Sequence, residues 1–147
     1  MAKTTDVAKW LDIGESRLEQ WIARGVLRPE HKPSPGLPRE WAMQDLMRAA
    51  ITQRLHSAGI TLSAWGGPDH VLAGALSDGF HGYTGAAAIL VLFAKFPGGP
   101  ISKRIIPVSK LADFAATEQH AFFLAINLDR LENEIVERFP DAAPEDH

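Results

Sequence analysis

The chain has 147 residues, of which 46% are hydrophobic and 22% are charged, and its formal net charge is −3. This length supports one compact domain or two small ones, and the acidic balance excludes a strongly basic, non-specific nucleic-acid binder. Cysteine is absent, which excludes disulfides, thiolate metal sites and iron–sulfur clusters within these residues.

Charge is divided unevenly between the two halves. Residues 1–60 contain nine Lys or Arg and seven Asp or Glu, whereas residues 61–147 contain six and eleven. The net charges of +2 and −5 indicate different partners for the two halves. The stretch "MAKTTDVAKW" lacks the apolar core of a signal peptide, and no apolar run approaches the roughly 20 residues of a membrane helix. We therefore expect a soluble, cytoplasmic protein with no membrane partner.

Two short helices joined by a tight turn are predicted at the start of the chain. The first runs through "VAKWL", in which Val7, Ala8 and Leu11 share one face. Capping oxygens are offered before it by Thr4, Thr5 and Asp6. The segment "DIG" then breaks the helical pattern. The second helix runs through "ESRLEQWIARG". Its apolar stripe is formed by Leu18, Trp21 and Ile22, and Gly25 ends it in the C′ position.

A proline-rich segment and a longer helix follow. From Arg28 to Glu40, "RPEHKPSPGLPRE" contains four prolines and is too poor in apolar residues for a core element, so we predict an exposed loop or ribbon. The next segment, "AMQDLMRAAITQRLHSAG", predicts a helix that ends at Gly59. Its apolar face consists of Met43, Leu46, Met47, Ala50, Ile51 and Leu55.

The second half predicts a ββαβα unit after a Gly-rich linker. The linker, residues 63–84, has one plausible short helix around Val71–Leu76. The elements after it are strands at Ala86–Phe96, Ile101–Val108 and Ala121–Ile126, and helices from Ser109 to about Thr117 and at Leu128–Phe139. The final residues, 140–147, are acidic and have little to bury, so we expect them to be disordered.

The last predicted helix has one apolar face. Its members are spaced i, i+3, i+7 and i+11, opposite Glu132, Glu137 and Arg138. They are Leu128, Leu131, Ile135 and Phe139. Such a face belongs either to the core of the chain or to a dimerisation surface, and we assign it to dimerisation of the domain at residues 85–139.

The first 62 residues resemble a known DNA-binding family. Helix, turn, helix, proline-rich loop and third helix is the order of a winged helix-turn-helix module. The segment "DVAKWLDIGESRLEQWIARGVLRP" is similar to the MerR-type DNA-binding domain. The matching positions are Val7, Ala8, Gly14, Ser16, Leu18, Trp21, Gly25, Leu27 and Pro29.

The resemblance continues through the wing and third helix, over about residues 4–62. The corresponding residues in "GLPREWAMQDLMRAAITQRLHSAGITL" are Gly36, Arg39, Trp41, Asp45, Leu46, Leu55, Gly59 and Leu62, with one extra residue in the wing. Two features differ: Glu19 stands where the family usually has arginine, and the Gly-rich stretch with the ββαβα unit replaces a long coiled-coil helix. The fold class expected is therefore α+β, with a winged helix-turn-helix at residues 1–62 and a small ββαβα domain.

The resemblance implies a transcriptional regulator that binds an inverted-repeat operator in double-stranded DNA as a homodimer. At about 100° per residue, Arg17, Gln20 and Arg24 line one flank of the second helix, and the carboxylates of Glu15 and Glu19 lie on the opposite flank. Arginine and glutamine can read guanine and adenine edges in the major groove. The predicted DNA-binding residues are Ser16, Arg17, Gln20, Arg24, Arg28, His31, Lys32 and Arg39, the last four gripping phosphates from the wing.

Other interpretations remain open from sequence. The helix pair could serve protein contact, or its charged stripe could be a solvated face. Trp10, Trp21 and Trp41 are better explained as core residues than as stacking platforms. Glu19 could form an ion pair with Arg39 or another wing residue and brace the wing against the helix. An excisionase-like DNA architectural factor and an antitoxin-like protein-interaction adaptor are the alternative functions.

No catalytic site or cofactor is expected. The six histidines lack metal-ligand spacing, "FPGGPISKR" lacks the order of a phosphate-binding loop, and no nucleophile–base arrangement is present. We therefore expect no metal, no bound nucleotide and no enzymatic activity. A small effector or a protein partner could bind the C-terminal domain, but no pattern marks a pocket there.

Overall fold

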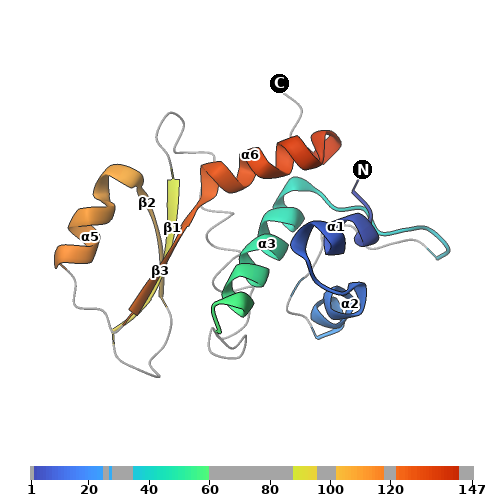
Figure 1. The fold of residues 1–147 in the computed structure, drawn as a ribbon, viewed down its shortest axis with the longest axis horizontal. Helices are drawn as coiled ribbons and strands as arrows, with labels where there is room; N and C mark the ends of the chain where they lie inside the picture. Colours follow the sequence, from blue (N-terminus) through green and yellow to red (C-terminus); the bar gives the residue numbers. More distant parts are fainter. Residues whose placement is uncertain are drawn as a thin grey trace. The chain divides into compact units, whose positions relative to one another are not determined.

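The computed structural model describes residues 2–24, 27, 35–59, 88–95, 102–117 and 122–142. These residues form helices and a three-stranded antiparallel sheet, so the chain is an α+β protein (Figure 1). Contacts between residues divide the chain into two compact units. The helical unit comprises Met1–Gly59 and Leu131–His147, and the sheet unit comprises Ile60–Arg130. None of the helices in the described part is both long and apolar enough to cross a membrane.

The first two helices, α1 (Thr4–Leu11) and α2 (Glu15–Ala23), form the predicted pair. Asp12 turns the chain between them in the left-handed conformation, with φ 56° and ψ 45°. Gly14 then precedes α2 with φ −68°, a value that any residue adopts. The turn therefore needs its special backbone conformation at Asp12, a residue type that tolerates it, and not at the glycine.

The predicted capping of α1 is wrong in detail. The helix already begins at Thr4, and the preceding Lys3 makes no capping hydrogen bond through its side chain. The Thr4 hydroxyl instead accepts a hydrogen bond from the indole Nε1 of Trp41 at 3.1 Å. Trp41 is fully buried and also forms an antiparallel bridge with Ala2. The chain that leaves the proline-rich segment is thus anchored beside the start of α1.

The third helix, α3 (Met43–Ser57), supplies the largest part of the helical core. Asp45 is buried and accepts a hydrogen bond from the backbone N–H of Ala42 at 3.0 Å, which satisfies a donor at the start of the helix. The predicted apolar face is confirmed, because every member is buried: Met43, Leu46, Met47, Ala50, Ile51 and Leu55. The side chains that pack from the other two helices include Val7, Ala8, Leu11, Leu18 and Trp21.

The last helix, α6 (Leu128–Arg138), corrects the prediction of a dimerisation face. The four apolar side chains assigned to that face are all buried inside the single chain: Leu128, Leu131, Ile135 and Phe139. From Leu131 onward the helix belongs to the helical unit. Phe139 there meets Trp10 edge to face, with ring centroids 5.6 Å apart. The face is consumed by packing within the chain and is not available to a second subunit.

A short turn follows α6 in the part of the chain expected to be disordered. Pro140–Ala142 form a 3-10 turn (η5), in which the N–H of Ala142 donates to the carbonyl of Phe139 at 3.0 Å. These three residues are therefore ordered. Residues 143–147 lie outside the described residues, as do the Gly-rich linker at 63–84 with its predicted helix at Val71–Leu76 and the helix-ending Gly25.

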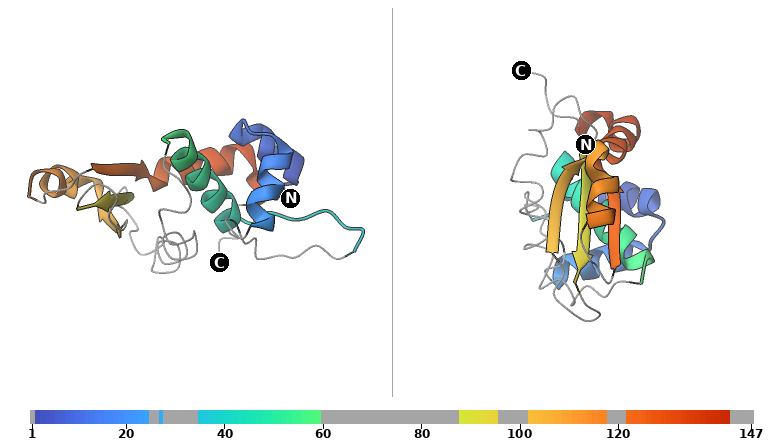
Figure 2. Two further views of the ribbon diagram at one scale, coloured as in Figure 1. Left: turned by 90° about the horizontal axis from the view of Figure 1, so that it is seen from below. Right: turned by 90° about the vertical axis from the view of Figure 1, so that its left-hand side faces the viewer.

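The sheet unit contains the three predicted strands (Figure 2). The central strand is β1 (Ala88–Ala94), with β2 (Ser102–Pro107) and β3 (Phe122–Asn127) on its two sides, both antiparallel to it. Their order along the chain is that expected from the sequence, with α5 (Leu111–Thr117) between β2 and β3 after a 3-10 turn, η4 (Val108–Lys110). Residues 89–94 of β1 are all buried, in agreement with the apolar run of this strand.

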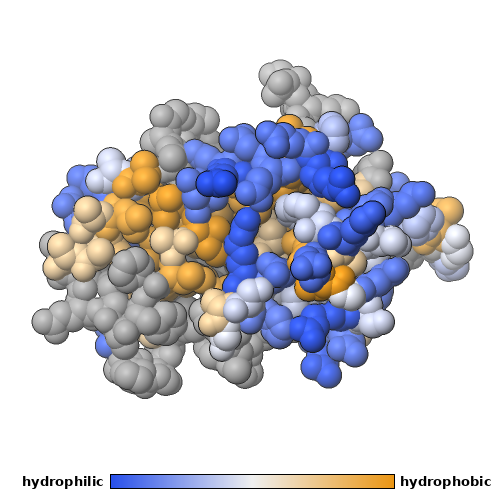
Figure 3. Space-filling model, in the orientation of Figure 1, coloured by the Kyte–Doolittle hydropathy of each residue, from blue (hydrophilic) through white to orange (hydrophobic). Residues whose placement is uncertain are grey.

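One face of the sheet packs against α5. Phe114 of this helix meets Phe93 of β1 edge to face, with ring centroids 5.3 Å apart. The Arg104 guanidinium lies 5.6 Å from the Phe93 ring and 5.5 Å from the Phe114 ring, so a cation covers the aromatic pair. The other members of this cluster are Ile89, Val91, Ile106 and Leu111. On the face that Figure 3 shows, hydrophobic residues gather over the sheet unit, whereas hydrophilic ones cover most of the helical unit.

Candidate nucleic-acid interface

The surface of α2 is the first candidate for a DNA-binding site. Leu18 and Trp21 are buried and fix which side of the helix faces the core. The four residues of α2 and its end that we predict to contact DNA are all exposed: Ser16, Arg17, Gln20 and Arg24. A helix that turns about 100° per residue places Arg17, Gln20 and Arg24 on one flank of this exposed surface. Their arrangement therefore agrees with the predicted stripe.

Two carboxylates border the same surface. A shallow depression on α2 is lined by Glu15, Ser16, Glu19, Gln20 and Ala23. Glu19 thus lies across the helix from Arg17 and Arg24, but beside Gln20. The prediction that Glu19 lies away from DNA therefore applies to the flank of Arg17 and Arg24, whereas a groove that receives Gln20 would also lie close to this carboxylate.

Glu19 does not pair with Arg39. Both are described residues, and they form no ion pair with each other. Glu19 is exposed, and Arg39 is half-buried. The other wing residues that Glu19 was expected to reach lie outside the described residues, so a brace through one of them stays a prediction.

Arg17 has a partner that the sequence did not reveal. Its Nη1 contacts the imidazole Nε2 of His56, a residue in the last turn of α3. The same imidazole meets the Trp21 ring edge to face, with centroids 5.9 Å apart and planes at 70°. Residues 39 positions apart in the chain are thus joined at the candidate interface. Helical periodicity could not show this contact, because it depends on how α2 packs on α3.

The segment predicted to form the wing is described only at residues 35–40. The predicted contact residues Arg28, His31 and Lys32 lie outside the described residues. Gly36 has φ +82°, which is strained for any residue with a side chain. Leu37 beside it is 64% exposed, the largest value among the exposed large hydrophobic residues that are described. An apolar side chain thus projects from a segment flanked by prolines.

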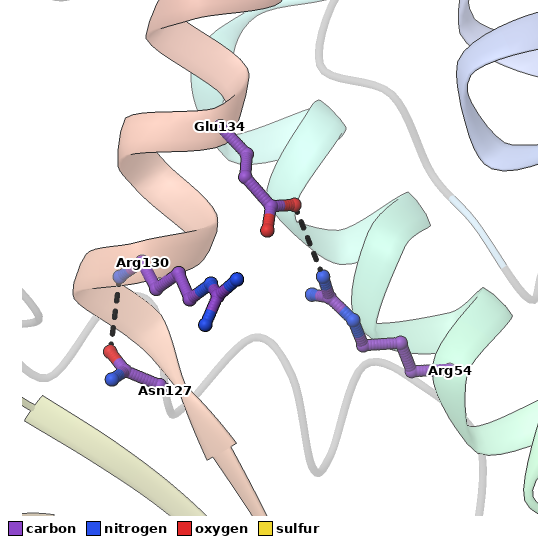
Figure 4. A network of polar contacts seen from close by, with 4 residues as sticks. All are labelled: Arg54, Asn127, Arg130 and Glu134. Carbon is purple, nitrogen blue, oxygen red and sulfur yellow. Dashed lines mark hydrogen bonds and ion pairs between the residues drawn. The ribbon is translucent and has the colours of Figure 1, made fainter.

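The three tryptophans of the helical unit serve packing, and a cation of α3 is paired within the protein. Trp21 and Trp41 are buried and Trp10 is half-buried against Phe139, which confirms their prediction as core residues. Arg54 of α3 is not available as an isolated cation, since its Nη2 lies 3.3 Å from Glu134 Oε2 of α6 (Figure 4). The positive charge of α3 near this point is therefore paired within the protein.

The sequence matches no protein-family model and no curated protein. The assignment of a function therefore depends on the residue pattern of the N-terminal segment and on the geometry of α1, α2 and α3.

Proposed function

We propose that this protein is a sequence-specific, DNA-binding transcriptional regulator of MerR-like type, which binds an inverted-repeat operator as a homodimer in the cytoplasm. One observation carries the proposal: α2 follows α1 across a tight turn, buries Leu18 and Trp21, and leaves a polar stripe exposed. A second helix held in this way can enter the major groove of DNA. The resemblance of residues 4–62 to the MerR-type domain supports the same function.

The exposed side chains of α2 have the chemistry of base recognition. Arg17 offers planar guanidinium donors to the O6 and N7 acceptors of guanine, and Gln20 offers one donor and one acceptor to adenine. Ser16, in the first turn, can donate to a phosphate or a base. Arg24 at the other end of the helix is positioned to neutralise a phosphate, which fixes the register of the helix without reading sequence.

The carboxylates of α2 limit how the helix approaches DNA. Phosphates repel Glu15 and Glu19, so the flank that carries these carboxylates should face away from the nearer phosphate backbone. A glutamate that reaches a base edge can accept a hydrogen bond from the N4 amino group of cytosine. Glu19 then contributes selectivity in place of the arginine that the family usually has. Its replacement by arginine should raise affinity for all DNA and weaken the preference for cytosine.

The remaining contacts are assigned to the wing and to a second copy. Arg28, His31, Lys32 and Arg39 would grip phosphates beside the groove. A single helix reads few bases, so two copies binding two half-sites would supply the specificity of a regulator. Because the apolar face of α6 is buried within the chain, pairing must use another surface. A small effector or a protein partner could act through the sheet unit.

Selection of bound sequences from a random pool of double-stranded DNA tests the proposal. At moderate salt, the wild-type chain should enrich an inverted repeat. Combining Arg17→Ala with Gln20→Ala should erase the base preference, whereas Lys32→Ala should weaken binding to all sequences alike. Failure of the wild-type chain to enrich any motif would overturn the proposal, and equal behaviour of the two variants would overturn the assigned contacts.

The exposure of Leu37 favours a second candidate, an excisionase-like architectural factor that bends DNA. Apolar side chains inserted between base pairs unstack them and kink the duplex. Leu37 is 64% exposed and lies between Gly36 and Pro38, which suits a stiff wedge. A bending assay by fluorescence energy transfer distinguishes the candidates. An architectural factor should bend its DNA site strongly, and Leu37→Ala should lose the bend. A regulator that only reads bases should bend the DNA equally in the wild-type chain and in Leu37→Ala.

A further inference from the structure

Three side chains from two helices meet beside the proposed reading surface. Arg17 and Trp21 belong to α2, and His56 belongs to the last turn of α3. The guanidinium Nη1 of Arg17 contacts Nε2 of His56, and the imidazole meets the indole of Trp21 edge to face. Trp21 is 5% exposed, so the core holds its ring firmly. His56 is exposed. Its imidazole therefore connects the buried ring of Trp21 to the exposed side chain of Arg17.

The direction of the hydrogen bond follows from chemistry. A guanidinium has only donors, so Nη1 of Arg17 must donate and Nε2 of His56 must accept. The accepting nitrogen carries no proton, and the proton of the neutral ring is on Nδ1. Four further N–H groups of the guanidinium are not used in this contact, because the group has five in all. Arg17 can therefore contact His56 and still present a pair of donors to a guanine edge.

We infer that His56 is a positioning residue for Arg17, which holds the guanidinium in the orientation that reads a base. The inference rests on the proposed function. A free arginine side chain loses rotamer freedom when it binds, and an arginine already held by an acceptor loses less. His56 thereby sets base selectivity without touching DNA. Trp21, held by the core, fixes the imidazole of His56. The imidazole in turn orients the Arg17 guanidinium, which reads the base.

Three substitutions separate the hydrogen bond from the aromatic packing. His56→Gln places an amide oxygen about where Nε2 lies, and so keeps an acceptor for Arg17 but loses the ring. His56→Asn carries the same amide one methylene shorter, with its oxygen near the position of Nδ1, and cannot reach. His56→Phe keeps a ring against Trp21 but has no acceptor. A role in packing alone predicts that Phe is tolerated, whereas a positioning role predicts that Gln is tolerated.

The first test uses the free protein and needs no DNA. The side-chain ¹⁵N–¹H signals of Arg17 report whether its guanidinium is held. These signals should be protected from solvent exchange in the wild-type chain and in His56→Gln, and should lose protection in His56→Asn and His56→Phe. Equal protection in all four proteins would overturn the inference, whatever the protein binds.

The second test measures selectivity on the DNA motif enriched by the wild-type chain. Two DNA duplexes are compared: the motif, and the same motif with the base read by Arg17 changed. The ratio of the affinities for these two duplexes should fall by roughly 2- to 10-fold in His56→Asn and His56→Phe, and should be retained in His56→Gln. An unchanged ratio in His56→Phe would overturn the inference and leave the proposed function intact. Absence of any enriched motif for the wild-type chain would instead overturn the proposed function. Thermal unfolding of each variant establishes that it is folded at the assay temperature.

Discussion

The indole ring of Trp10 on α1 and the ring of Phe139, directly after α6, meet edge to face with planes at 87° and centroids 5.6 Å apart. The two residues are separated by most of the chain, and yet they belong to the same compact unit. The apolar face of α6 thus completes the core of the helical unit. The proposed DNA-binding module is therefore not confined to the first 62 residues, because its packing requires a helix from the other end of the chain.

This packing predicts a large loss of stability in Phe139→Ala. Phe139 is 8% exposed, and removal of a buried phenylalanine side chain costs about 3 kcal/mol or more, from lost burial and the cavity left behind. Val136→Ala provides a matched control on the same helix, since Val136 is 38% exposed. Its free energy of unfolding should change by less than about 1 kcal/mol. Urea denaturation measures both, and equal effects would show that α6 does not complete this core.

The contact between Arg54 and Glu134 should contribute little to the free energy of unfolding. The two side chains lie 3.3 Å apart and are each 39% exposed, so solvent and salt screen their attraction. A double-mutant cycle of Arg54→Ala and Glu134→Ala should give a coupling free energy of at most about 1 kcal/mol. The coupling should shrink further when the salt concentration is raised. A coupling above 2 kcal/mol, on the order expected of a buried pair, would contradict this assignment.

Asn127 is predicted to cap α6. Its Oδ1 accepts a hydrogen bond from the backbone N–H of Arg130 at 3.0 Å, at the point where β3 ends and α6 begins (Figure 4). Asn127→Ala should lower the free energy of unfolding by about 1 kcal/mol, whereas Asn127→Ser should retain most of the stability. Asn133, exposed inside the same helix, is the control. Asn133→Ala should be neutral or slightly stabilising because alanine has the higher helix propensity.

Trp41 and Thr4 should show a measurable coupling. The indole N–H of Trp41 donates to the Thr4 hydroxyl at 3.1 Å, and Trp41 is fully buried. Trp41→Phe removes the donor, and Thr4→Val removes the acceptor with little change of shape. The single variants and the double variant, measured by thermal unfolding, should give a coupling free energy of about 1 kcal/mol. If the effects of the two substitutions on the free energy of unfolding were additive, the hydrogen bond would not anchor the chain at Trp41 to α1.

Much of the local structure could be predicted from the sequence, because it depends on short-range periodicity. The spacing of Leu18 and Trp21 predicts the buried side of α2, and the apolar run of β1 predicts a strand. The α+β class follows from these elements. The segment "DIG" predicts the break between α1 and α2, but the sequence does not show that Asp12 is the residue that adopts the left-handed conformation there.

The errors concern contacts between distant parts of the chain. The apolar face of α6 predicts that this side of the helix is buried. It does not predict whether the face packs on Trp10 of the same chain or on a second subunit. The contact of Arg17 with His56 depends on the packing of α2 on α3, which no local pattern encodes.

Recognition of DNA sequence by α2 is tested by comparing two affinities at one salt concentration. Fluorescence anisotropy gives the dissociation constants of the wild-type chain for its selected operator and for a scrambled duplex of the same length. We predict that the operator binds at least about 10³-fold more tightly, and that Arg17→Ala combined with Gln20→Ala reduces this ratio to near one. Equal affinity of the wild-type chain for both duplexes would contradict recognition of DNA sequence by α2.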